Sequence, residues 1–254
     1  MNRTGLARII FITGTDTGVG KTLLTGLLLH HLRQSGCHAL AIKPFCSGSR
    51  ADTEFLHAVQ DGELTPDEIT PFFFAEPLAP QVAARRHHRS IRLPAVLRRI
   101  RRVADRCQCL LIEGIGGLLV PLGEGFTVRD LIARLDCEVI IVARNRLGTI
   151  NHTLLTVDAL QHIGIQWFKA VLMSSLEDDF SSGSNGQMLA ELLAPTPVFP
   201  VGCLGRNPLR FEALKKSQKK IERTLAQIMS SGIVYPRVLY QSGVGGSKIV
   251  ENSF

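Results

Sequence analysis

A glycine-rich segment near the start of the chain, residues 13–22, constrains the fold more than any other feature of the sequence. It reads TGTDTGVGKT, overlaps the end of the short apolar run 8–13 and leads into residues 21–35, which have the apolar spacing of a helix. A buried strand, a glycine loop ending in Gly-Lys-Thr and a helix form a cradle for phosphate groups, because backbone N–H groups and the positive end of the helix face the anion. The sequence therefore predicts a nucleotide-binding loop.

Each residue type in this loop has a definite expected role. The lysine Lys21 reaches the outer phosphates, and the hydroxyl of Thr22 is a ligand for Mg²⁺. The strict motif has glycine at position 15, where this chain has Thr15, so the pattern departs at one position while its context holds. The residues expected to contact the nucleotide here are Gly18, Val19, Gly20, Lys21 and Thr22.

Short apolar runs alternate with helical patterns along the rest of the chain. The runs are 8–13, 38–43, 109–113, 138–143, 168–173 and 196–201. The helical segments are 21–35, 52–60, 94–106, 127–135, 151–163 and 184–194. Because the runs are apolar on successive residues, they fit strands covered on both faces. The alternation predicts a single α/β domain with a doubly wound, mostly parallel sheet.

The end of the chain follows a different pattern. Residues 211–230 space their apolar side chains roughly as an amphipathic helix does, so we expect one helix packed on the sheet. After Gly232 the sequence is rich in glycine and serine and has no regular period. We therefore expect a folded domain over residues 1–232 and a flexible tail over 233–254.

Composition limits the kinds of partner and the cellular compartment that we expect for this chain. The net charge of +7 over 254 residues permits an anionic partner without identifying it. The six cysteines have no metal-ligand spacing, which favours free thiols in a reducing compartment. No stretch approaches the ~20 apolar residues that a membrane span needs. We expect a cytoplasmic protein that does not contact membranes.

Charged residues stand at the carboxyl ends of two predicted strands, the edge at which open parallel sheets bind ligands. Glu113 ends one run and is followed by Gly114; it could complete a Mg²⁺ site with Thr22, or point into water. Lys43 ends another run and, by itself, would be interpreted as a solvated lysine. Asp52 opens a predicted helix and would by default be its N-cap.

Five segments in order resemble the dethiobiotin synthetase family, whose fold is of the P-loop NTPase type. They read GTDTGVGKT, KPFCSGS, PFFFAEPLAP, IEGIGGLLVPL and RLGTINHTLLT, over residues 8 to about 165. The resemblance implies a cyclo-ligase that uses ATP and Mg²⁺ to join CO₂ to 7,8-diaminononanoate and close the ring of dethiobiotin in biotin biosynthesis. In that family a carbamate forms first and is converted to a carbamic-phosphoric anhydride.

The resemblance also implies roles for individual residues. It places Thr17, Lys21 and Lys43 at the reacting carbamate and phosphoryl group. It assigns Mg²⁺ to Thr22, Asp52 and Glu113. Further nucleotide contacts would come from Glu113, Gly114, Gly116, Ser174 and Ser175. The serines stand where the family commonly has an asparagine that reads adenine, and residues 201–203 lack the usual proline, so base selectivity is left open.

The substrate contacts implied by the resemblance are Ser47, Gly148, Thr149, Ile150 and Asn151. In the family, the loop that corresponds to 147–152 leads into a helix whose N-terminus receives the substrate carboxylate from the partner subunit. This implies a homodimer with a shared active site. The alternative is an ordinary connection between a strand and a helix, capped by local polar groups.

Nine arginines lie within residues 85–106. On a helix over 95–106 most of them face away from the apolar side chains Val96, Ile100 and Val103, which indicates a solvated face. The alternative is a nucleic-acid footprint, and with it a dimeric partitioning-type ATPase that binds DNA. Such ATPases usually carry an additional lysine early in the phosphate loop, where this chain has Thr15 and Asp16. We therefore expect small-molecule partners and no nucleic acid.

Overall fold

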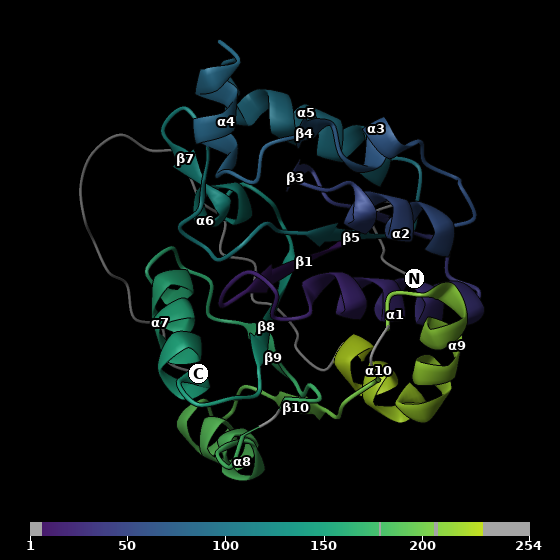
Figure 1. Cartoon of the computed structure of the whole chain (residues 1–254), viewed down its shortest axis with the longest axis vertical. Helices are drawn as coiled ribbons and strands as arrows, with labels where there is room; N and C mark the ends of the chain where they lie inside the picture. The colour runs from purple at the N-terminus through teal and green to yellow at the C-terminus, as the bar shows by residue number, and fades with distance from the viewer. Residues whose placement is uncertain (1–6, 178, 206–207, 231–254) are drawn as a thin grey trace, which may run out of the picture.

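The computed structural model describes residues 7–177, 179–205 and 208–230, and a six-stranded parallel sheet forms its centre (Figure 1). The strand order is β10-β9-β8-β1-β5-β2. The strands are β1 (Arg8–Gly14), β2 (Ala39–Ile42), β5 (Cys109–Glu113), β8 (Glu138–Arg144), β9 (Phe168–Met173) and β10 (Val198–Val201). Each corresponds to one of the six apolar runs, so the predicted parallel sheet is confirmed.

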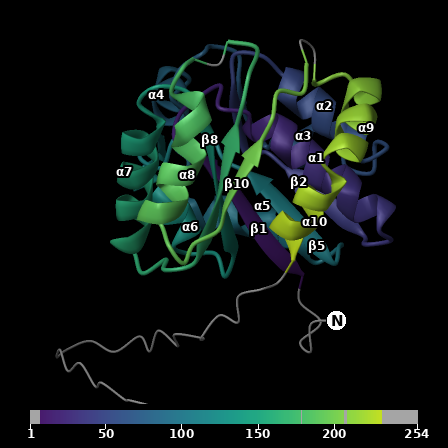
Figure 2. The same cartoon turned by 90° about the horizontal axis from the view of Figure 1, so that it is seen from below.

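Helices cover both faces of this sheet, which explains why the strands are apolar on successive residues. All residues of β2, β5 and β9 are buried. Figure 2 shows α7 (Thr149–Gln161) and α8 (Ser182–Leu192) on one face and α1 (Lys21–Gln34) on the other. The doubly wound arrangement is therefore confirmed. It brings the carboxyl ends of β1, β2 and β5 to the same edge.

The remaining predicted helices form close to their expected bounds. They are α2 (Ala51–Val59), α5 (Leu93–Ala104) and α6 (Val128–Ile132). Several short elements were not predicted, because strands of two or three residues and helices of one or two turns are too short to show a period. These are β3 (Phe45–Ser47), α3 (Pro66–Ile69), β4 (Phe72–Phe74), α4 (Pro80–Arg86), β6 (Pro121–Gly123) and β7 (Phe126–Thr127).

The prediction of one helix over residues 211–230 is wrong in its continuity, and the expected contact with the sheet is made only by the second part of the segment. Two helices form, α9 (Phe211–Lys220) and α10 (Glu222–Met229), and they are separated at Ile221, which has φ −120° and ψ 19°. Each helix buries side chains of its own: Leu214, Ser217 and Gln218 in α9, and Leu225, Ile228 and Met229 in α10. α9 packs on α1 and α2, and α10 contacts α1 and β10.

Two further expectations concern the end of the chain and its relation to membranes. The predicted tail 233–254, with residue 232 at the boundary of the expected domain, lies outside the described residues. Within the described ranges, no helix has the length and apolar character needed to cross a membrane.

Candidate active site

The phosphate loop connects β1 to α1 at the carboxyl edge of the sheet. α1 begins at Lys21, directly after Gly20, whose φ of 103° lies in the left-handed region that favours glycine. The buried Lys21 Nζ donates hydrogen bonds to the carbonyl oxygens of Asp16 (2.7 Å) and Gly116 (2.9 Å). Burial lowers the pKa of Lys21 to about 8, against the opposing effect of the nearby Glu113 carboxylate. The ammonium group of Lys21 is thus held by backbone carbonyl groups of the phosphate loop and of the segment after β5.

Glu113 connects the phosphate loop to the neighbouring strand. It ends β5, where it pairs in register with Ile12 of β1, and its side chain is fully buried. Its Oε1 accepts hydrogen bonds from Thr22 Oγ1 at 2.7 Å and from Lys43 Nζ at 2.8 Å. Its Oε2 is buried and has no hydrogen-bond partner among the described residues. The alternative of a glutamate pointing into water is therefore wrong.

Lys43 joins two carboxylates that are far apart in the sequence. Its Nζ donates hydrogen bonds to Glu113 and also to Asp52. Burial by itself would lower the pKa of Lys43, but the carboxylates of Glu113 and Asp52 outweigh it and raise the pKa above its usual value. Lys43 is therefore a buried cation whose charged form is stabilised by two carboxylates. The interpretation as a solvated lysine is wrong.

Asp52 lies in the first turn of α2, and Arg50 is the N-cap residue of that helix. The default interpretation of Asp52 as the N-cap is therefore wrong by two positions. Its carboxylate is directed to Lys43 instead. The helix begins at Ala51. Acidic residues in its first turn are favoured because they lie at the positive end of the helix dipole.

These side chains surround a cavity of about 740 Å³, a volume typical of small-molecule sites. The site residues from the sequence that line it are Thr17, Gly18, Gly20, Lys21, Thr22, Lys43, Ser47, Asp52, Glu113 and Gly116. The lining of this cavity therefore includes both lysine ammonium groups and carboxylates. Such a cavity can neutralise charge on a phosphoryl group while leaving carboxylate oxygen for a cation.

An apolar wall of the same cavity was not assigned from the sequence. It is formed by Pro77, Leu78, Ala79, Pro80, Pro208 and Leu209. The first four belong to the segment PFFFAEPLAP, which carried part of the family resemblance but no assigned role. That conspicuous pair of prolines was the available signal. Residues 208–209 carried no such signal, because they lie in a stretch of sequence that has no regular apolar spacing.

The structure does not bring every expected site residue to this cavity. Val19 is buried in the phosphate loop, and Gly114 is not among the cavity-lining residues and lies against the Phe11 ring. Ser174 and Ser175 follow β9; their hydroxyls accept hydrogen bonds from Asn145 Nδ2 and Arg144, both at 3.2 Å. The segment from Gly148 to Asn151 begins α7 elsewhere on the same edge of the fold.

Comparisons with known proteins agree with this geometry. A family model described as an AAA domain matches residues 8–210. The chain is 43% identical over 196 residues to the ATP-dependent dethiobiotin synthetase BioD of Anaeromyxobacter sp. (strain Fw109-5), covering 75% of this chain and 88% of the relative. It is 38% identical over 201 residues to the protein of the same name from Bacillus subtilis (strain 168), covering 76% and 86%.

Solved structures give a more distant likeness. A ParA family ATPase from Chlorobium tepidum TLS aligns with a TM-score of 0.52 over 89% of this chain and 96% of its own, at 12% identity. At that identity the likeness supports the P-loop fold alone. The relatives with high identity decide the family: this chain belongs to the dethiobiotin synthetases.

Proposed function

We propose that the cavity beside Lys21 and Lys43 is where this chain carries out ATP-dependent dethiobiotin synthesis, a ligase reaction of biotin biosynthesis. The observation that carries the assignment is the shared Glu113 carboxylate, which bonds Thr22 of the phosphate loop and Lys43 of the neighbouring strand. A nucleotide-binding element and a second buried cation thereby face one cavity. This is the arrangement that phosphoryl transfer to a bound acceptor requires.

The nucleotide phosphates would occupy the loop that precedes α1. Lys21 would release its bonds to Asp16 and Gly116 and turn to the outer phosphates. Burial lowers the pKa of Lys21 because the ammonium group loses its contact with water. A negatively charged phosphate beside the lysine would raise this pKa again and so favour the protonated form. The backbone around Gly18 and Gly20 would supply N–H donors at the positive end of the helix.

Mg²⁺ fits the residues at this position. The Thr22 hydroxyl and the carboxylates of Asp52 and Glu113 are hard oxygen ligands, and the buried Glu113 Oε2 lacks a partner. No group of three or more His, Cys, Asp or Glu side chains suited to a metal occurs in the described ranges, so phosphate oxygens and water would complete the shell. When bound, Mg²⁺ would supply neutralisation of charge on the phosphates.

The chemical steps are those of the family, and this chain's residues would position and neutralise the reacting groups. One amine of the diamine adds CO₂ and loses a proton to give a carbamate, whose oxygen attacks the γ-phosphorus as ADP leaves. The second amine then attacks the carbamoyl carbon, and phosphate departs as the ring closes. Lys43 would stabilise negative charge on the carbamate and the transferred phosphoryl group, and Thr17, which lines the same cavity, would lie beside them.

The apolar wall of the cavity suits the aliphatic chain of the diamine. Leu78, Pro80 and Leu209 line the cavity with hydrocarbon side chains, and Ser47 adds a hydroxyl to the same lining. Burying methylene groups against such a wall favours binding by about 0.8 kcal/mol for each CH₂. The hydrocarbon side chains would thus contact the methylene groups of the substrate, and Ser47 would contact one of its polar groups.

A homodimer would bring the α7 N-terminus of one subunit to the cavity of the other. Gly148 precedes this helix with φ 91°, and no side chain caps its first turn, which leaves donors for a substrate carboxylate. Leu155 lies exposed on α7, Leu147 is exposed just before the helix, and Leu119 is exposed three residues after the cavity residue Gly116. Large apolar side chains exposed in this way would be buried by a protein interface.

A complementation assay tests the shared site. Lys43→Ala disables one side of each site, and Asn151→Asp places a negative charge where the carboxylate would bind. Mixed after dissociation, the two inactive variants should recover about one quarter of wild-type turnover, because half of the dimers are mixed and each has one intact site. Absence of recovery in verified mixed dimers would contradict the shared site.

The function itself is tested with purified protein, 7,8-diaminononanoate, bicarbonate, ATP and Mg²⁺. Phosphate release should depend on the diamine, and mass spectrometry should detect the cyclic urea in equal amount. Phosphate release that is indifferent to the diamine would contradict the proposal and favour a switch ATPase.

A further inference from the structure

The positive charge of this protein is concentrated in one short segment. Residues 77–106 contain nine arginines and a single acidic residue, Asp105, a net charge of +8. The whole chain has a net charge of +7, so the remaining residues together carry −1. The basic character of the protein is therefore a local property of α4, α5 and the connection between them.

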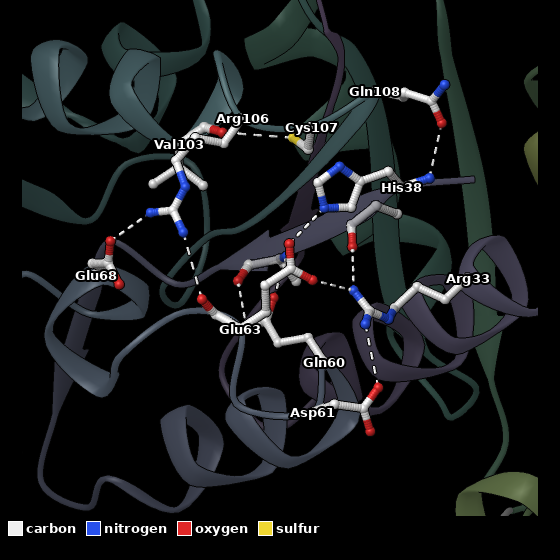
Figure 3. Close-up of polar contacts among 12 residues, drawn as sticks. Arg33, His38, Gln60, Asp61, Glu63, Glu68, Val103, Arg106, Cys107 and Gln108 are labelled. Carbon is white, nitrogen blue, oxygen red and sulfur yellow. Dashed lines mark hydrogen bonds and ion pairs between the residues drawn. The ribbon is translucent and has the colours of Figure 1, made fainter. Parts of the chain in front are cut away.

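All nine of these arginines are exposed. Arg106 is neutralised, because its guanidinium donates to Glu68 Oε1 at 2.6 Å and lies near the ion pairs of Glu63 (Figure 3). None of the other eight forms an ion pair with a carboxylate of the described residues. These eight we call the arginine face: Arg85, Arg86, Arg89, Arg92, Arg98, Arg99, Arg101 and Arg102.

Packing of α5 does not require this charge. The helix buries Val96, Ile100 and Val103 against the core, and those residues account for its attachment. On the opposite side Arg98, Arg101 and Arg102 stand at i, i+3 and i+4, where like charges repel and weaken a helix. The fold thus tolerates an arrangement that costs stability in the isolated protein, and an anionic partner would relieve it.

Two members of the face are held by aromatic rings from β4. The guanidinium carbon of Arg89 lies 5.3 Å from the centre of the Phe74 ring, and that of Arg99 lies 5.7 Å from the centre of the Phe72 ring. Side chains positioned in this way lose less rotamer entropy when they bind a ligand. Figure 1 shows α4 and α5 next to each other along one side of the molecule.

The sequence by itself favoured a solvated face and no nucleic-acid partner, but the lack of ion pairs within the described residues and the aromatic contacts of Arg89 and Arg99 reverse that preference. We propose that the arginine face is a docking surface for the phosphate backbone of nucleic acid. Guanidinium groups bind phosphate oxygens in pairs of parallel hydrogen bonds, and several on one surface match a repeated anion. A lipid surface fits less well, because an amphipathic helix that enters a membrane inserts its apolar face, and that of α5 is buried in the core. No base-reading element is required, so the binding would not depend on sequence.

Fluorescence anisotropy with a labelled 20-base-pair duplex, as DNA and as RNA, tests this proposal on the full chain. We expect micromolar binding at 50 mM KCl that weakens steeply up to 200 mM. The variant Arg98→Gln/Arg101→Gln/Arg102→Gln should weaken binding at least 10-fold and reduce the slope of log K against log salt by about 2 to 3. Unchanged thermal melting and ligase turnover would show that the variant folds.

The matched control removes three exposed lysines from α9, as Lys216→Gln/Lys219→Gln/Lys220→Gln. It lowers the net charge equally and should change the affinity less than 2-fold. Equal losses in both variants, or no binding by the wild type at 50 mM KCl, would overturn the proposal. Co-sedimentation with phosphatidylglycerol vesicles that exceeds binding to either duplex would overturn it in favour of a lipid surface.

Discussion

Glu113 Oε1 and Lys43 Nζ lie 2.8 Å apart, although 70 residues separate them in the chain. The contact exists because β5 and β2 are adjacent parallel strands with Ile112 opposite Ile42, so the next residue of each strand emerges at the same edge. Thr22 approaches the same carboxylate from the phosphate loop. One buried carboxylate thereby sets the positions of a cation and a hydroxyl from different elements.

Lys43→Ala should reduce turnover by about 100-fold or more, because it removes a preorganised positive charge from a buried site. Steady-state assays with diamine and ATP measure the effect, and circular dichroism checks the fold. Lys216→Ala, an exposed lysine on α9, is the control and should leave turnover unchanged. Near-normal turnover of the Lys43 variant would remove this residue from the reaction.

Asp52→Asn should raise the Mg²⁺ concentration for half-maximal activity by at least about 10-fold, because an amide oxygen binds a hard cation more weakly than a carboxylate. A titration of MgCl₂ at fixed ATP measures the shift. Asp67→Asn is the matched control: this aspartate is exposed and pairs with Arg50 on the surface, 3.3 Å away. Identical titrations for both variants would show that Asp52 holds no metal.

Gly20→Ala should lower the free energy of unfolding by about 1–3 kcal/mol, because φ of 103° strains any other residue. The added Cβ would also lie 3.2 Å from Met173 Cγ. Denaturant unfolding measures the loss, and ATP binding should weaken with it. Gly186→Ala within α8, where the nearest atom is Leu172 Cδ2 at 3.9 Å, should be neutral or stabilising by up to about 1 kcal/mol. Equal stability of the two variants would contradict the strain at Gly20.

The partly buried Cys107 and the buried Cys109 should react with alkylating agents at rates that depend on pH. Burial raises the pKa of Cys107 to about 11 and that of Cys109 to about 12, because a thiolate loses solvation there. Since only the thiolate reacts, alkylation of both should be at least about 100-fold slower at pH 8 in the folded protein than in denaturant, and should accelerate with pH up to about 11. Peptide mass spectrometry after timed iodoacetamide treatment resolves each cysteine. Rates at pH 8 that match those of the denatured chain would contradict the burial.

The periodic part of the fold could be predicted from the sequence. Six strands and the long helices each bury many apolar side chains, so their spacing is visible along the chain. The phosphate loop is equally local, since its glycines, Lys21 and Thr22 are consecutive or nearly so. The break at Ile221 was not visible, because the apolar spacing continues across it while the backbone direction changes.

By itself, the sequence determined which segments become buried strands and where the phosphate loop lies, because both follow from neighbouring residues. Only the tertiary structure decided that Lys43 is a buried cation between Asp52 and Glu113, and that Asp52 is not a helix cap. It also decided that Leu209 and Thr17, which are far apart in the sequence, line the same cavity. The physical reason is that strand order and the crossing of elements set these contacts, and neither is encoded in the spacing of any single segment.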